Sequence, residues 1–323
     1  MRSGPRRHDV SAFAGQAGRS SNLPVAIGWM MLALVSFSLV AITGRAASKG
    51  LTTIELMFVR SWIGAALLLL FMLVTGRKLD LLLTSRMPLH LTRIVIHFGA
   101  QYSWLAALTM IPLAELFAIE FTAPLWVALI APLVLREQLT PIRLTASMLG
   151  FVGVMVVVQP GLLAGQVGVQ MSTGSLLALA SAFGFAFSMV ATKLLTRTEP
   201  VLRILVYMHV FQGVIAGLLL PNGLPWPPLD IFLWAAGVAV AGLSAHVGLT
   251  MAFARADVII VAPLDFFRLP LMAAVGVYLY GEPLTSTLAL GASVVVSGNA
   301  LNIWAEQRAQ RMRSALQGGR PGR

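Results

Sequence analysis

The chain repeats itself at a constant offset of 145 residues, and this duplication restricts the possible folds more than any other feature. Adding 145 to Glu120, within PLAELFAIEFTAPLWVAL, gives Asp265, within ADVIIVAPLDFFRLPLMAA. The same shift carries Glu137 onto Glu282. A constant offset through these acidic residues and the apolar runs around them indicates an internal duplication, so the two halves should share one fold.

Each half consists of apolar runs of about 20 residues, the length that a membrane-spanning helix needs. The chain is 58% hydrophobic and 11% charged, which is typical of a multi-pass membrane protein. Continuous apolar runs favour helices over a barrel. We therefore predict an all-α membrane protein of ten transmembrane helices in two inverted five-helix repeats. The predicted spans are residues 24–44, 53–74, 89–110, 112–135, 141–159, 172–193, 201–221, 229–252, 257–280 and 286–304.

The distribution of Lys and Arg predicts the orientation in the membrane. If the N-terminus is cytoplasmic, the outer loops carry Arg45 and Lys49, whereas the other Lys and Arg residues of the loops and tails lie inside. This asymmetry follows the positive-inside rule, so both termini should be cytoplasmic in the plasma membrane, here a bacterial inner membrane. Five helices per repeat is an odd number, so the second repeat enters the membrane upside down.

The predicted organisation follows from these spans. It comprises a disordered cytoplasmic tail (1–23), a first repeat (24–160), an outer linker (161–173), a second repeat (174–305) and a basic cytoplasmic tail (306–323). The run at 24–44 could alternatively be the core of a signal peptide, but its match to the second repeat argues against this. The net charge of +11 lies in short loops and tails, so no nucleic-acid partner is expected.

Two paired motifs carry a resemblance to a known family. The corners REQLT and GEPLT, the entry segments LTMIPLAE and LTMAFARAD, and the closing LGFVGVMVVVQPG resemble the two EamA-type repeats of the drug/metabolite transporter superfamily. The resemblance covers about residues 27 to 305. It implies a ten-helix transporter of metabolites such as amino acids, S-adenosylmethionine or riboflavin. Arg136, before the corner glutamate, and Glu120, within a helix, depart from the common pattern.

Inverted repeats are a recurrent plan of secondary transporters, with the substrate site near the membrane midplane. The chain has no cysteine, no phosphate-binding GxxxxGK[ST] loop and no metal-ligand or catalytic-triad spacing, so we expect neither an enzyme nor a cofactor. The preferred function is alternating-access transport of a small organic solute, with proton coupling and a homodimer left open. A translocator of a lipid-linked intermediate is the main alternative, and a membrane sensor or enzyme is a third.

Four ionisable side chains fall well inside predicted spans. Arg60 and Glu120 lie about 12 Å from the outer face, and His209 and Asp265 lie about 12 Å from the inner face. We expect pairs of Arg60 with Glu120 and of His209 with Asp265, because an unpaired charge in lipid is costly. These pairs either bind substrate or carry protons, or they are structural ion pairs that fix helix contacts.

Three further features accompany these charges. Arg268, one turn after Asp265, either neutralises it or binds an anionic substrate group. Pro124 and Pro270 are expected to interrupt their helices, and Pro124 should free the carbonyl of Glu120.

The third span carries a polar and aromatic stripe of Arg93, His97, Gln101 and Trp104 at steps of three and four residues. The stripe should face the interior and line a substrate path, although Arg93 could merely extend to the membrane surface. The lone His246 is expected to be a packing residue. The residues expected on the substrate or proton path are Arg60, His97, Gln101, Trp104, Glu120, His209, Asp265 and Arg268.

Glycine pairs predict where helices approach one another closely. Gly150 with Gly153, and Gly213 with Gly217, would each give a helix a small face.

Overall fold

The computed structural model describes residues 23–76, 83–123, 125–127, 129–130, 141–158, 171–195, 198–220, 223, 226–253, 264 and 267–318. In these residues the chain forms ten helices and no strands, as the apolar runs predicted. The helices are α1 (Leu23–Ala47), α2 (Thr53–Val74), α3 (Met87–Met110), α4 (Leu113–Glu120), α6 (Pro141–Val158), α7 (Thr173–Leu195), α8 (Val201–Leu218), α9 (Leu229–Phe253), α11 (Arg268–Tyr280) and α12 (Ser286–Gly318).

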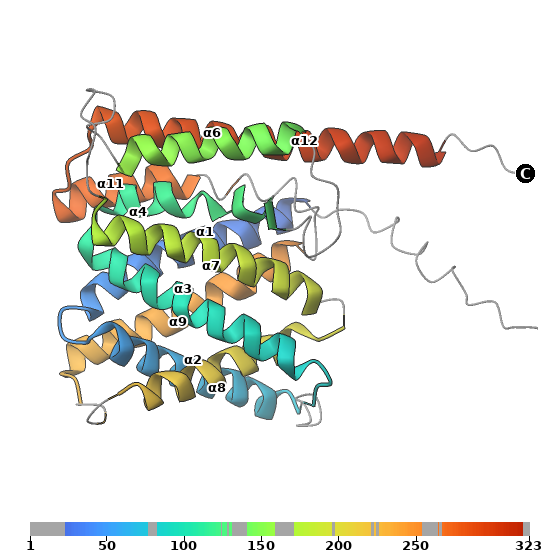
Figure 1. Cartoon of the computed structure of the whole chain (residues 1–323). Coiled ribbons are helices and arrows are strands. Elements are labelled where there is room, and N and C mark those ends of the chain that lie inside the picture. Colours follow the sequence, from blue (N-terminus) through green and yellow to red (C-terminus); the bar gives the residue numbers. More distant parts are fainter. Residues whose placement is uncertain are drawn as a thin grey trace, which may run out of the picture.

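The helix contacts follow the duplication. In chain order, each of the first five helices has one of the last five as its counterpart, so that α7 corresponds to α1 and α9 to α3. The extensive contact of α1 with α9 therefore has an equivalent in the contact of α7 with α3, and both are present. Three other contacts join a helix to its own counterpart: α2 with α8, α4 with α11, and α6 with α12. Figure 1 shows α6 and α12 along one edge of the bundle and α2 and α8 along the opposite edge. The two halves therefore form one bundle in which they contact each other throughout.

Counterpart helices run in opposite directions. Phe58 of α2 lies against Gly217 of α8, and Trp62, one turn later, lies against Gly213, which comes one turn earlier. The predicted small face of α8 is thereby confirmed, because these two glycines accommodate the aromatic rings of α2. Antiparallel packing of equivalent helices means that the second half is inverted relative to the first.

The closest approach of the two halves joins α6 to α12. A Cβ atom placed on Gly153 would lie 2.7 Å from the backbone nitrogen of Val295 and 2.8 Å from the carbonyl oxygen of Gly291. These distances leave no room for a side chain, so the glycine allows the two backbones to touch. Gly153 thus has the packing function predicted for it.

Five helices within the described residues are long and apolar enough to cross a membrane: Pro24–Ala47, Thr53–Val74, Thr173–Thr192, Val201–Leu218 and Leu229–Leu249. The other five predicted spans overlap α3, α4, α6, α11 and α12. Of these, α3 carries the polar stripe, and the apolar parts of α6, α11 and α12 within the described residues are shorter.

Large apolar side chains cover much of the outer surface. Examples are Val35 of α1, Phe71 of α2, Met148 of α6 and Val240 of α9, each of which is about half exposed. An apolar surface of this extent suits lipid rather than water.

The last helix extends past its predicted end. The predicted span ended at residue 304, but α12 continues to Gly318 and projects beyond the other helices (Figure 1). The N-terminal tail, through residue 22, lies outside the described residues.

Candidate functional site

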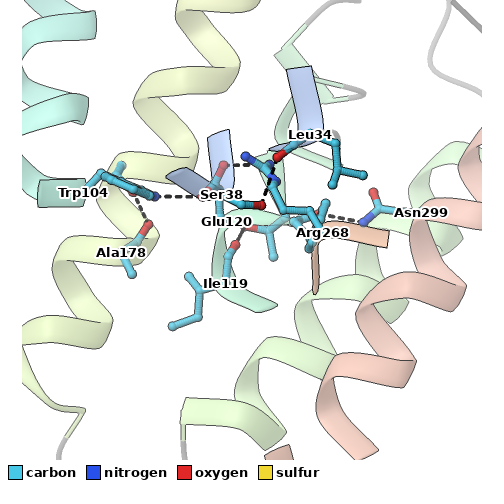
Figure 2. Close-up of polar contacts among 11 residues, drawn as sticks. Leu34, Ser38, Trp104, Ile119, Glu120, Ala178, Arg268 and Asn299 are labelled. Carbon is cyan, nitrogen blue, oxygen red and sulfur yellow. Dashed lines mark hydrogen bonds and ion pairs between the residues drawn. The ribbon is translucent and has the colours of Figure 1, made fainter. Parts of the chain in front are cut away.

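An acid–arginine centre lies where α4 ends. The Glu120 carboxylate accepts a hydrogen bond from Arg268 Nη2 at 3.0 Å and another from Trp104 Nε1 at 2.7 Å. Figure 2 shows Glu120 between these two side chains, which come from α11 and α3. The Arg268 side chain is only 7% exposed and that of Glu120 is 16% exposed, so the pair is held in a poorly solvated interior. The centre joins both repeats, because Arg268 belongs to the second.

The backbone irregularity beside Glu120 is compensated by α12. Helix α4 ends at Glu120, four residues before Pro124, as expected where a proline interrupts a helix. The carbonyl oxygen of Phe121 accepts a hydrogen bond from Asn299 Nδ2 at 2.6 Å (Figure 2). Irregular backbone at this depth needs such a partner. Sequence reasoning missed Asn299, although an amide within the apolar run of α12 was a usable signal.

The predicted pairing of Glu120 with Arg60 is wrong. The Glu120 carboxylate is bonded to Arg268 and Trp104, whereas the Nε and Nη1 atoms of Arg60 have no partner in the described part of the chain. Arg60 and Glu120 were matched by depth alone, and depth does not specify the side of the helix. Asp265, the predicted partner of His209 and Arg268, lies outside the described residues, as does Pro124. Pro270 does not interrupt α11, because it lies in the first turn of that helix.

Instead, Arg60 lies in a second group of buried basic side chains. We define the basic cluster as Arg60 of α2, Arg93 and His97 of α3, and His209 of α8; each is at most 7% exposed. His209 packs against Gly64, one turn after Arg60, so closely that a Cβ atom there would collide with its ring. The predicted equivalents Arg60 and His209 therefore meet, because their helices pack together in opposite directions.

The α3 stripe faces the interior, as predicted. Arg93 donates from Nε to Thr192 Oγ1 of α7 at 2.5 Å and from Nη2 to Met208 Sδ of α8 at 3.6 Å. His97 Nδ1 forms a hydrogen bond with Gln212 Nε2 at 2.8 Å. Arg93 thus does not extend to the membrane surface but connects α3 to two helices of the other repeat.

The ring of Phe37 lies between the acid–arginine centre and His246. The guanidinium of Arg268 lies 5.1 Å from the ring centroid of Phe37, and the His246 ring packs edge-on against Phe37 at 5.9 Å. His246 is therefore in packing contact, as predicted, and it also lies within electrostatic range of His97. The stripe, the acid–arginine centre and the basic cluster form one polar interior between the halves of the chain.

The pattern of two equivalent halves matches a known family. The model of the EamA-like transporter family matches residues 24–159 and again residues 172–304. The chain belongs to the EamA-like transporter family. It is a multi-pass membrane transporter rather than an enzyme, and the duplication seen in its sequence is a pair of EamA repeats.

Several characterised relatives are similar over most of their length. The riboflavin transporter of Rhizobium johnstonii is 31% identical over 287 residues, which are 88% of this chain and 92% of the relative. The S-adenosylmethionine uptake transporter of Rickettsia bellii is 26% identical over 289 residues, covering 88% of this chain and 95% of the relative. A solved crystal structure is similar with a TM-score of 0.60 and 21% identity, covering 88% of this chain and 98% of its own; it supports the fold alone.

A clamp closes the two EamA repeats together at the end of the bundle where α1 finishes and α2 begins. Arg45 forms an ion pair with Glu282, and it donates to the carbonyl oxygens of Leu108 at 2.9 Å and Ile111 at 2.8 Å. The second Glu282 oxygen accepts from the backbone nitrogen of Leu113 at 2.8 Å. A surface cavity of about 510 Å³ lies over this clamp. Sequence reasoning noted Glu282 only as the counterpart of Glu137 and missed its partner, Arg45.

Proposed function

We propose that this EamA transporter moves a small organic metabolite across the bacterial inner membrane by alternating access as a secondary active transporter. The observation that carries the proposal is the buried polar interior between the repeats, which includes Glu120, Arg268 and the basic cluster. Buried ionisable groups in a membrane protein are costly and mark substrate or ion pathways. The inverted packing supports alternating access, because rocking one repeat against the other changes the side on which such a site opens.

The membrane orientation is part of the proposal. Both termini are placed in the cytoplasm, which puts the Arg45–Glu282 clamp at the outer face and the loop between α7 and α8 at the inner face. The excess of Lys and Arg in the loops assigned to the cytoplasm supports this orientation. A phosphatase reporter fused after residue 323 should be inactive and a fluorescent reporter there should be bright. Strong phosphatase activity would reverse the topology.

The substrate is expected to be a planar heterocyclic or nucleoside-like solute. Relatives that carry riboflavin or S-adenosylmethionine support this class. A proton or substrate gradient supplies the driving force. Translocation of a lipid-linked intermediate is less well supported, because the interior centres of the described residues are charged and enclosed by helices from both repeats.

Transport assays test this proposal directly. Purified protein in liposomes should exchange internal unlabelled solute for external labelled solute, with riboflavin, S-adenosylmethionine and amino acids as the panel, each with and without a proton gradient. Exchange should be saturable and absent from protein-free liposomes. A protein that exchanges none of the panel but moves a fluorescent lipid-linked sugar between leaflets would instead support the alternative.

A further inference from the structure

The basic cluster contains more buried donors than the described protein satisfies. Arg60 lacks partners at Nε and Nη1, Arg93 lacks one at Nη1, and His209 lacks them at both ring nitrogens. Arg60 is 3% exposed and His209 is 1% exposed, so bulk water does not supply these bonds. Buried polar atoms nearly always have a partner, and exceptions concentrate at functional positions. The cluster therefore has unused hydrogen-bonding capacity at the centre of the bundle.

The side chains that carry these unpartnered atoms are all basic. Arg60 and Arg93, which both carry a positive charge, lie within electrostatic range of the same side chain, His97. Two acidic side chains of the described residues are already paired with cations: Glu120 is bonded to Arg268, and Glu199 to Arg203. Like charges held together in a poorly solvated interior repel one another. The basic cluster therefore has no anion among the described residues to balance its positive charge.

The donors converge from both repeats. Arg60 and His209 meet across the α2–α8 contact, and Arg93 reaches α8 at Met208, the residue next to His209. Gly64 has no side chain, so the His209 ring can lie against α2 beside Arg60. A ligand bound here would contact α2, α3 and α8 together, which lets its binding influence how the repeats are arranged.

We propose that the basic cluster binds an oxyanion group, a phosphate or a carboxylate, of the transported metabolite. This rests on the proposed transport function and specifies its substrate class. Arg60, from Nε and Nη1, and Arg93, from Nη1, have N–H groups left to donate to such a group, and guanidinium donors suit carboxylate and phosphate. In the Glu120–Arg268 pair the two charges neutralise each other, so this pair contacts the remainder of the solute rather than its oxyanion group.

Matched ligand pairs test the charge requirement. Riboflavin and flavin mononucleotide share one ring system and differ by a phosphate, and nicotinamide and nicotinate differ by a carboxylate. Each is added at 1 mM to the full-length protein in detergent, and the thermal unfolding midpoint is measured. We expect an anionic member to raise the midpoint by several degrees more than its neutral partner. Flavin mononucleotide alone would identify phosphate, and nicotinate alone carboxylate. Equal responses within both pairs, including no response, would overturn the proposal.

Charge removal separates binding from a structural role. Arg60→Gln should abolish the extra stabilisation by the anion, and it should raise the midpoint of the ligand-free protein because repulsion is relieved. Arg308→Gln is the matched control, because Arg308 is exposed and stacks on Trp304 of its own helix. If Arg60→Gln yields no folded protein, Arg93→Gln should likewise abolish the extra stabilisation by the anion. A variant that is less stable but keeps the full anion response would refute the site.

Liposome exchange distinguishes failure of this inference from failure of the proposed function. A protein that exchanges riboflavin or nicotinamide and is indifferent to the added phosphate or carboxylate keeps its transport function and loses the anion site. A protein that is stabilised by anions through Arg60 but exchanges no solute keeps the anion site and loses the transport function.

Discussion

The two polar centres of the interior differ in how their charges are compensated. In the acid–arginine centre, Glu120 has a cation and an indole donor at hydrogen-bonding distance. In the basic cluster, Arg60 and His209 are as deeply buried but have unpartnered nitrogens. A compensated buried pair fixes one arrangement of helices, whereas an uncompensated group is available to something outside the chain. The difference suggests that stability resides mainly in the first centre and recognition in the second.

Arg268→Ala should have the largest effect, because it breaks the compensated centre. The Glu120 carboxylate would remain buried without its cation, and removal of one partner of a buried pair costs about 3–5 kcal/mol. We expect a large fall in folded protein and in the thermal unfolding midpoint, together with loss of transport.

A double variant sharpens that result. Arg268→Met combined with Glu120→Gln removes both charges and should recover most of the stability without recovering transport. Glu120→Gln alone should abolish or uncouple transport at a nearly normal protein level. If the double variant transports at the wild-type rate, the pair is structural and its place in the pathway is refuted.

Trp104→Phe keeps an aromatic ring in the same place but removes the hydrogen bond to Glu120. A hydrogen bond to a charged group contributes about 1.5–3 kcal/mol, so transport should fall by about tenfold or more while protein level is kept. Trp126→Phe is the control, because the Trp126 indole nitrogen is buried without a hydrogen-bond partner in the described residues. Equal effects of the two substitutions would assign the loss to ring packing.

The charges of Arg45 and Glu282 also neutralise each other, but this clamp lies at one end of the bundle. Glu282→Gln should weaken closure there by about 1 kcal/mol. Because the chain has no cysteine, a cysteine introduced at the buried position Ile111 reports opening by its rate of labelling. We expect severalfold faster labelling in Glu282→Gln and no change in Lys49→Gln, which alters the wall of the same cavity. Unchanged labelling would show that the clamp does not control access.

The smallest effect is expected at the other end, in the loop that joins α7 to α8. Burial alone would raise the pKa of the Glu199 carboxyl, but hydrogen bonds from Thr84 and Arg203 hold that pKa below its usual value. A lowered pKa stabilises the fold above the unfolded value of about 4.3, and this stabilisation is lost as the pH falls through the folded pKa. Glu199→Gln should lower the unfolding midpoint by at most about 2 °C at pH 7. The variant and the wild type should not differ at a pH low enough to protonate the Glu199 carboxyl in both the folded and the unfolded state.

The sequence predicted well what depends on position along a single helix. Each of the ten helices overlaps a predicted apolar span, and the spacing of four and seven residues between Arg93, His97 and Trp104 indicated that they share a buried face. The partner of Glu120 could not be predicted in this way. Depth is one coordinate, and the contact with Arg268 also depends on the rotation of α4 and α11 and on the end of α4 at Glu120.

The contacts of helices with their own counterparts have an evolutionary consequence. The contacts of α2 with α8, α4 with α11 and α6 with α12, together with the equivalent contacts of α1 with α9 and α7 with α3, make most of the contact between the halves a repeat meeting an inverted copy of itself. Such a surface is self-complementary, like the isologous interface of a two-fold dimer. A single five-helix ancestor would already have had the contacts needed to assemble as an antiparallel dimer. Fusion of two copies then allowed each half to diverge, so that one carries Arg60 where the other carries His209.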